Sequence, residues 1–325
     1  MFKQLLIVCI SSLFMFSCKT VEGNFVPTKQ LEVVSSASKL KQLWAGGKFT
    51  EGPTIDNGGN VLFTDIRVNR IMKYDRKTGH TSIYRKNSNG ANGLLFRKGK
   101  LYSCEGADLQ FGSVAVTETN GTKKVLASEY KGKKLNSPND LIMADNGVIY
   151  FTDPRYGSTK GKELDFEGVF MIKRGKTILA TKETERPNGI LISYDQRTMF
   201  IADNNNTPGG ARTLLKFDIT SDGTLTNRKV LFSFRDDQRG MDGMAMDKEG
   251  NIYATAGKGA DSGIYVFSPE GVHLAFIPLP DMPTNCAFGG SGEKNMLYIT
   301  CQAKRQPNVN KKFGLFRIEL NKSAR

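Results

Sequence analysis

Short apolar segments recur along the chain, and each ends in a small or acidic residue and follows a turn rich in Gly, Asn or Asp. Six of these segments share one pattern, and they cover residues 60–65, 100–105, 148–153, 198–203, 251–256 and 295–300. The aromatic residues that align within them lie 39, 48, 50, 53 and 45 residues apart. A spacing of roughly 40–50 residues is that of one blade of a β-propeller.

A second apolar segment follows most of the first ones after a short turn, at residues 70–75, 168–173, 214–218, 263–268 and 314–319. No stretch between them keeps a helical period of about 3.6 residues, which argues against βαβ units and a parallel sheet. A β-sandwich would require shorter and less regular spacing. We therefore predict an all-β fold, a six-bladed β-propeller over residues 41–325.

The N-terminus has the features of an export signal. Lys3 precedes an apolar run over residues 5–16, which is too short to span a bilayer, and the run ends at Ser17 and Cys18. The segment Met15-Phe16-Ser17-Cys18 resembles a bacterial lipobox. We predict a lipoprotein-type signal peptide over 1–17, a lipid on Cys18 and a polar tether over 18–40. The protein would then be exported, to the periplasm or the cell surface, and would meet the membrane only through its lipid anchor.

Composition narrows the choice of partners and chemistry. The net charge of +14 raises the question of nucleic acid, but Lys and Arg are scattered through turns and no nucleic-acid motif is present. Beyond Cys9 and Cys18 the cysteines show no metal-ligand spacing, and we expect buried free thiols, with a Cys286–Cys301 disulfide as the alternative. His80 and His273 are expected in exposed turns, which weakens a mechanism built on paired histidines. The chain has no GxSxG, phosphate-loop or dinucleotide motif.

Four turns, each just ahead of an apolar segment, carry a polar residue: Glu51, Asn139, Asn188 and Asp242. In a propeller such turns open the innermost strands of different blades, so we expect the four side chains to point at the axis. Two carboxylates and two amide carbonyls form an all-oxygen set that suits Ca²⁺ or Mg²⁺. Each residue alone is also an ordinary turn former.

Further polar residues are expected near the same cavity. Asn92 and Glu105 belong to the second blade and Asn285 has the corresponding position in the last one, although each could simply stabilise its turn. Asp153 and Asp203 end aligned segments, and we expect them to hold neighbouring turns together.

From residue 49 to 319 the chain resembles the senescence-marker-protein/gluconolactonase family, which includes regucalcin-type lactonases. The resemblance is carried by Glu51-Gly-Pro53, Cys104-Glu-Gly106, Leu135-Asn-Ser-Pro-Asn-Asp-Leu141, Phe151-Thr-Asp-Pro-Arg-Tyr-Gly157, Arg186-Pro-Asn-Gly189 and Asp242-Gly243. It implies a six-bladed propeller with one divalent cation on its axis, bound by Glu51, Asn188 and Asp242. Asn139 would complete the site or contact the substrate.

The resemblance also implies an activity, the opening of a sugar lactone. The cation, Ca²⁺ first and Mg²⁺, Mn²⁺ or Zn²⁺ as alternatives, would polarise the carbonyl while Asp242 acts as general base, or a metal-bound hydroxide attacks instead. Asn92, Glu105, Asn139 and Asn285 are the residues expected to contact substrate. Two other functions stay open: a non-catalytic, calcium-stabilised propeller that binds carbohydrate or protein, and a phosphotriesterase-like hydrolase.

Overall fold

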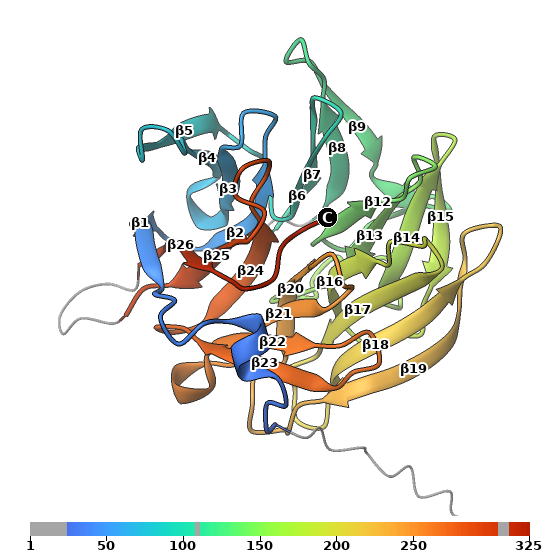
Figure 1. Ribbon diagram of the computed structural model, residues 1–325. Helices are drawn as coiled ribbons and strands as arrows, with labels where there is room; N and C mark the ends of the chain where they lie inside the picture. Colours follow the sequence, from blue (N-terminus) through green and yellow to red (C-terminus); the bar gives the residue numbers. More distant parts are fainter. Residues whose placement is uncertain (1–24, 108–110, 305–311) are drawn as a thin grey trace, which may run out of the picture.

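Six four-stranded antiparallel sheets are arranged as blades around a common axis in the computed structural model, which describes residues 25–107, 111–304 and 312–325 (Figure 1). Listed from the axis outward, the first three blades contain β2 (Thr50–Ile55), β3 (Val61–Asp65), β4 (Arg70–Tyr74) and β5 (Thr81–Lys86); β6 (Leu94–Arg97), β7 (Lys100–Glu105), β8 (Ser113–Thr117) and β9 (Lys123–Ala127); and β12 (Leu141–Met143), β13 (Ile149–Asp153), β14 (Gly168–Lys173) and β15 (Lys176–Thr181).

The other three blades continue the same order. They contain β16 (Pro187–Ile192), β17 (Thr198–Asn204), β18 (Arg212–Ile219) and β19 (Leu225–Ser233); β20 (Met241–Met246), β21 (Ile252–Ala256), β22 (Gly263–Phe267) and β23 (His273–Pro278); and β24 (Pro283–Phe288), β25 (Met296–Gln302), β26 (Phe313–Glu319) and β1 (Lys41–Gly47). A small hairpin, β10 (Glu129–Tyr130) with β11 (Lys133–Lys134), and three short helical segments, α1 (Gln30–Val33), η1 (Ile66–Val68) and η2 (Gly259–Asp261), complete the described elements. The predicted six-bladed propeller is confirmed.

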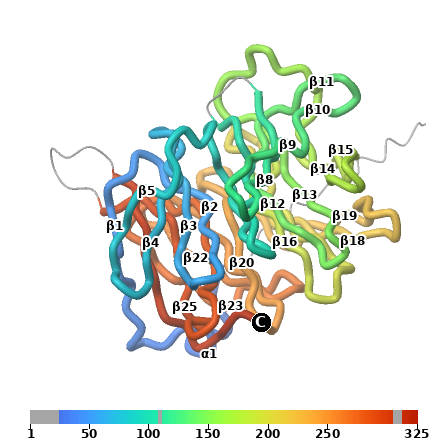
Figure 2. Tube along the Cα trace, turned by 90° about the horizontal axis from the view of Figure 1, so that it is seen from above, coloured from blue at the N-terminus to red at the C-terminus, as the bar shows by residue number. Residues whose placement is uncertain are grey.

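The ring is closed by its N-terminal strand. β1 pairs antiparallel with β26, so that Ala45 faces Gly314 and the outermost strand of the last blade comes from the start of the domain. This pairing joins residues far apart in the sequence and leaves no blade incomplete. The C-terminal tail returns to α1, where the Asn321 N–H donates to the Val33 carbonyl at 2.9 Å (Figure 2).

The apolar core lies between the blades. Five of the six aligned aromatics are buried, because the second strand of each blade has a neighbouring blade on either side; Tyr102 is partly exposed. One apolar cluster joins Tyr150 and Met171 of the third blade to Ile201 and Phe217 of the fourth. These interblade clusters position the innermost strands, and therefore the turns in front of them.

Buried aspartates fix those turns, as expected for Asp153 and Asp203. Each carboxylate accepts hydrogen bonds from the two backbone N–H groups that precede the innermost strand of its own blade. Asp65 shows the same arrangement. The pairs of donors are Lys48 and Phe49 for Asp65, Asn136 and Ser137 for Asp153, and Glu185 and Arg186 for Asp203.

Threonine hydroxyls join neighbouring blades close to the axis. Thr64 Oγ1 donates to the Asn92 carbonyl at 3.0 Å, and Thr152 Oγ1 donates to the Asn188 carbonyl at 2.7 Å. Thr255 Oγ1 makes the equivalent bond to the Thr284 carbonyl at 2.8 Å. All three threonines are fully buried, so these bonds are shielded from water and fix the height of one inner strand relative to the next.

One of the two histidines differs from the sequence-based expectation. His273, expected in an exposed turn, is buried at the start of β23, where its ring packs against Phe232, Tyr265 and Phe267 and Nε2 lies 3.0 Å from the Ala275 carbonyl. A bulge in the β22–β23 pairing at Val266/Phe267 adjoins this position. His80 is exposed as expected.

The described part of the predicted tether, residues 25–40, lies on the domain: the Phe25 ring packs against Phe232 and Phe234, and Val33 is buried. The predicted signal peptide and Cys18 fall outside the described residues. Cys104, Cys286 and Cys301 are free and buried, as favoured from the sequence. No helix in the described ranges is long and apolar enough to cross a bilayer.

Candidate functional site

A polar cavity of about 400 Å³ lies where the innermost strands begin. Glu51, Asn188 and Asp242 are the second residues of β2, β16 and β20, while Asn92 and Asn139 lie two residues before β6 and β12. The strands that start with Glu51, Asn188 and Asp242 are each bulged at that point, between Glu51/Thr54, Pro187/Ile190 and Met241/Met244. A bulge re-aims side chains, here toward the cavity.

Glycines bring these residues together around the axis. Gly52, Gly93, Gly189 and Gly243 each follow a cavity residue, and each packs against the equivalent residue of the next blade. A Cβ at Gly93 would lie 2.6 Å from the Asn139 carbonyl oxygen, and a Cβ at Gly189 would overlap the Asp242 carbonyl. Only glycine allows the backbones to approach this closely. This close approach explains why a glycine follows the cavity residue in Glu51-Gly, Asn92-Gly, Asn188-Gly and Asp242-Gly.

The two carboxylates of the cavity influence each other. Glu51 is only 3% exposed and Asp242 only 4%. Burial and the charge of Asp242 raise the pKa of Glu51 well above its usual value, although the N–H of Gly52 and the amide of Asn285 oppose the shift. Burial also raises the pKa of Asp242, against the lowering effect of Arg239, whose Nη2 contacts Asp242 Oδ2. Two buried carboxylates with raised pKa values favour a bound cation, which would stabilise both charges.

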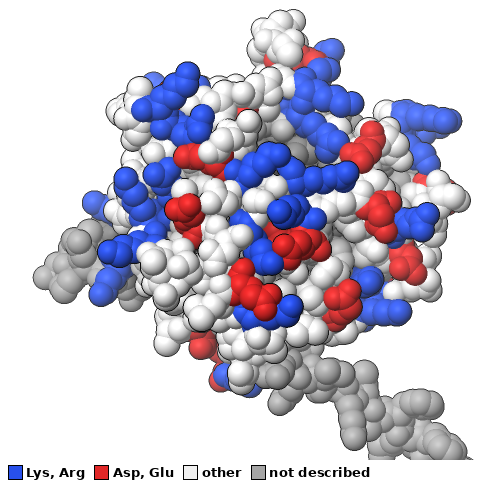
Figure 3. Space-filling model, in the orientation of Figure 1, with Lys and Arg blue, Asp and Glu red and all other residues white. Residues whose placement is uncertain are grey.

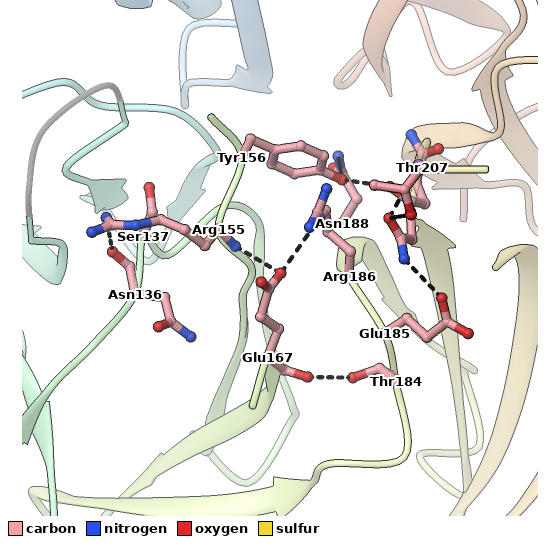
Figure 4. A network of polar contacts seen from close by, with 12 residues as sticks. Asn136, Ser137, Arg155, Tyr156, Glu167, Thr184, Glu185, Arg186, Asn188 and Thr207 are labelled. Carbon is pink, nitrogen blue, oxygen red and sulfur yellow. Dashed lines mark hydrogen bonds and ion pairs between the residues drawn. The ribbon is translucent and has the colours of Figure 1, made fainter. Parts of the chain in front are cut away.

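A loop between β13 and β14 contributes Tyr156 to the cavity wall (Figure 4). Asn188 Nδ2 donates to the Tyr156 hydroxyl at 3.0 Å, and that hydroxyl donates to the Asn204 carbonyl at 3.3 Å. The Arg186 guanidinium lies over the Tyr156 ring, 5.5 Å from its centre, and Arg186 Nε contacts Glu167 Oε2 at 3.3 Å. The loop is thereby fastened to the strand that carries Asn188.

The structure brings together most of the residues predicted for the site. Glu51, Asn92, Asn139, Asn188 and Asp242 all line the cavity. Asn285 lies behind it, against Gly243, with its amide bonded to Glu51 and to the buried Asp140. Glu105 is not among the described lining residues: its carboxylate contacts Ser103 at 3.0 Å, Asn89 at 3.0 Å and Lys123 at 2.6 Å.

The donor set fits a divalent cation that prefers oxygen. The Asn92 and Asn204 side-chain carbonyl oxygens are buried at the cavity without a hydrogen-bond partner, which is uncommon for a buried polar atom and indicates a missing ligand, ion or water. No group of three or more His, Cys, Asp or Glu is close enough to hold a metal within the described ranges. The cavity offers instead two carboxylates with amide oxygens, the ligands typical of Ca²⁺.

Several lining residues were not found by sequence reasoning, among them Tyr156, Asn204 and Arg239. Tyr156 lies in a motif that carried the family resemblance, but its loop has no periodicity from which a side-chain direction follows. Asn204 ends β17, directly after Asp203. Arg239 precedes Asp242 by three residues in a turn, where an arginine is usually solvated.

Comparison with known proteins gives concordant results. The family model described as "SMP-30/Gluconolactonase/LRE-like region" matches residues 49–303. A gluconolactonase of Zymomonas mobilis is 32% identical over 275 residues, covering 76% of this chain and 74% of that protein. Human regucalcin is 27% identical, covering 82% of this chain and 89% of its own.

Among solved structures, a gluconolactonase of Xanthomonas campestris superimposes with a TM-score of 0.74 at 25% identity, covering 89% of this chain and 91% of its own. A calcium-binding regucalcin of Agrobacterium tumefaciens shares the fold, with a TM-score of 0.69 at 18% identity over 88% of this chain and 95% of its own. With the family model covering most of the propeller and the site residues gathered in one cavity, the chain belongs to the SMP-30/gluconolactonase/LRE-like family.

Proposed function

We propose that the protein is a metal-dependent lactonase that hydrolyses a sugar lactone. The observation that supports this most is the convergence of Glu51 and Asp242 with the amides of Asn139 and Asn188 on one cavity of about 400 Å³. The similarity to a bacterial gluconolactonase over three quarters of both chains supports the same substrate class. A volume of this size accommodates a single sugar ring.

Glu51, Asn139, Asn188 and Asp242 are the residues that would hold one divalent cation, with Ca²⁺ as the first choice. The cation supplies Lewis-acid polarisation of the lactone carbonyl when bound. Glu51 and Asp242 provide the negative charge that retains it, and the amides add neutral oxygen ligands without further repulsion.

Asp242 is the candidate general base. Arg239 Nη2 contacts its Oδ2, and the Asn188 side chain also hydrogen-bonds this carboxylate. Both contacts hold the carboxylate at the cavity, where it would bind the cation or accept a proton from the attacking water. The water oxygen bonds to the carbonyl carbon as Asp242 takes one water proton, the ring C–O bond breaks, and the departing ring oxygen receives that proton from Asp242. The other water proton is released to solvent, because the product hydroxy acid ionises to its carboxylate form. Asn92 and Asn204 line the same cavity and are the neutral polar residues that would lie beside the sugar.

The test is hydrolysis of glucono-1,5-lactone, followed by acid release at constant pH after chelation and after return of Ca²⁺, Mg²⁺, Mn²⁺ or Zn²⁺. We expect activity to be lost on chelation and restored by at least one cation. Asp242→Asn should lower kcat about 10²- to 10⁴-fold. Asp145→Asn is the matched control, because Asp145 is exposed and pairs with Arg97 on the surface. No cation-dependent hydrolysis of any aldonolactone would refute the proposal, and hydrolysis of a phosphotriester alone would replace it.

We further propose that the protein is exported and anchored by a lipid on Cys18, as the N-terminal sequence suggests. Expression of the full chain in a bacterial host should give a protein that partitions into detergent after phase separation. Cys18→Ala should move it to the aqueous phase. Equal partitioning of both forms would contradict lipidation.

A further inference from the structure

Arg239 is the more enclosed of two arginines at the cavity. Its side chain is 14% exposed, Nη2 contacts Asp242 Oδ2, and Nη1 donates to the Pro283 carbonyl at 2.9 Å. The other arginine, Arg67, is exposed, and its guanidinium lies 5.4 Å from the centre of the Phe49 ring. Among the described lining residues, these two arginines and the carboxylates of Glu51 and Asp242 are the charged groups.

The placement of Arg239 reflects a difference between blades. In three blades a buried aspartate at the end of the second strand binds the turn before the inner strand, as with Asp65, Asp153 and Asp203. In the fifth blade the equivalent residue is Ala256, and the turn that carries Arg239 is held by a Gly257 N–H bond to the Arg239 carbonyl at 3.1 Å. No carboxylate of its own blade's second strand therefore competes with Asp242 for this guanidinium.

Counting charge gives Arg239 a role once a divalent cation is present. Without the cation, Glu51, Asp242 and Arg239 together carry one net negative charge when both carboxylates are ionised. With the cation they carry one net positive charge. Ring opening turns a neutral lactone into a carboxylate, so negative charge appears beside these three groups and the cation, whose charges sum to a positive value. Such a cavity stabilises the developing charge more than the neutral substrate.

We infer that Arg239 is a substrate-contacting residue that binds the carboxylate produced by ring opening, and that it pairs with Asp242 only while the cation is absent. The inference rests on the proposed function. A cation that takes Asp242 competes with Arg239 for the same oxygens, which frees donors of the guanidinium. The planar guanidinium can then donate two parallel hydrogen bonds to a carboxylate, which a lysine ammonium cannot.

Two ligands distinguish the effect of ligand charge on affinity from the effect of ligand shape. They are gluconate, the carboxylate product of gluconolactone opening, and glucitol, a neutral polyol of the same chain length. Their affinities for the Ca²⁺-loaded full chain are measured by calorimetry at fixed free Ca²⁺. For Arg239→Gln we expect gluconate to bind roughly 10-fold or more weakly, the effect of losing a charge-assisted hydrogen bond. Glucitol affinity should change less than gluconate affinity.

The same variant should bind Ca²⁺ about threefold to tenfold more tightly, because a competing positive charge has been removed. Arg239→Lys, which keeps the charge but not the planar group, should bind gluconate with intermediate affinity. Arg67→Gln is the matched control: it removes the same charge from the exposed rim, and its gluconate affinity should stay closer to wild type than that of Arg239→Gln.

Melting temperatures verify that each variant is folded. If Arg239→Gln does not fold, the gluconate affinity of Arg239→Lys tests the inference instead. A folded Arg239→Gln protein with wild-type gluconate and Ca²⁺ affinities overturns the inference. Failure of the proposed function is recognised separately, because a wild-type protein that opens no lactone fails the kinetic assay whatever the calorimetry shows.

Discussion

The Tyr156 hydroxyl accepts a hydrogen bond from Asn188 Nδ2 at 3.0 Å, so a loop residue determines how an inner-strand amide is turned. With Nδ2 held by the phenol, the Asn188 carbonyl oxygen is the atom left for a cation. Tyr156→Phe keeps the ring over which Arg186 lies and removes only the hydroxyl. We expect Ca²⁺ affinity to fall about 10- to 100-fold, the range seen when a residue that orients a metal ligand is lost.

Tyr194→Phe is the control for this variant, because the Tyr194 hydroxyl also contacts a backbone carbonyl, that of Met246 at 3.3 Å, but lies in a different surface depression. Calorimetric Ca²⁺ titration of both variants and of wild type is the measurement. Equal affinities in all three would show that Asn188 does not depend on Tyr156.

The raised pKa of Glu51 predicts that cation binding depends on pH. Burial and the charge of Asp242 favour the protonated form of Glu51, and a cation binds only the ionised form. As pH rises toward and through the pKa of Glu51, a smaller share of the protein must lose a proton to bind. We therefore expect apparent Ca²⁺ affinity to increase with pH, by up to about tenfold per pH unit below that pKa.

Calorimetry at pH 5.5, 6.5 and 7.5, in two buffers with different ionisation enthalpies, counts the protons released. Glu51→Gln should bind Ca²⁺ more weakly and show a smaller pH dependence. Binding that is independent of pH in wild type, with no proton release, would argue against a buried carboxylate pair at the cation.

The arrangement of blades was predictable because each blade repeats a local pattern. The segment expected at 198–203 corresponds to β17, Thr198–Asn204, and the segment at 263–268 corresponds to β22, Gly263–Phe267. The outermost strands were not foreseen, because they are half-exposed and lack an unbroken apolar pattern; β5, Thr81–Lys86, is one example. Closure by β1 was missed because its pairing of Ala45 with Gly314 leaves no local signal.

The site was partly predictable for the same reason. Glu51, Asn188 and Asp242 hold equivalent positions in the repeat, so fold symmetry alone brings them together. Glu105 also belongs to the repeat, but its carboxylate is bound by Lys123 of β9, two strands away in the same blade. A sequence does not show which of several partners a strand-end residue contacts. Lys and Arg are scattered along the sequence, and on the face shown in Figure 3 they lie among acidic residues, as that distribution predicts.

The contact between Gly243 and Asn285 gives a steric prediction. A Cβ at position 243 would overlap the Asn285 amide, which hydrogen-bonds Glu51. Gly243→Ala should lower the free energy of unfolding by about 1–3 kcal/mol, the usual cost of overpacking, and should weaken Ca²⁺ binding by displacing Asn285. In the Asn285→Ala background the same substitution should cost less, because the obstructing side chain is gone. Additive losses in the double mutant would show that the two residues do not share this contact.

Burial of Asp153 predicts a pH-dependent stability that is independent of the candidate site. Burial raises the pKa of Asp153 to about 7, even though the N–H groups of Asn136 and Ser137 lower it. The unfolded chain has the ordinary value near 3.8, so the folded state binds a proton more tightly. Its stabilising effect is complete below about pH 4 and is lost as pH rises through about 7.

Asp153→Asn cannot titrate and also loses one acceptor, so it should be less stable than wild type at low pH. The gap in unfolding free energy between the two should narrow by about 2 kcal/mol from pH 5 to pH 8, because only wild type then contains a buried charge. Urea unfolding followed by fluorescence of Trp44, the single tryptophan, reports on this, since Trp44 lies in the closing strand β1 and packs 5.6 Å from Phe63. Asp145 is exposed, so the unfolding free energy of Asp145→Asn should change with pH in the same way as that of wild type. A gap between Asp153→Asn and wild type that stays constant across this pH range would mean that Asp153 remains ionised in the folded protein.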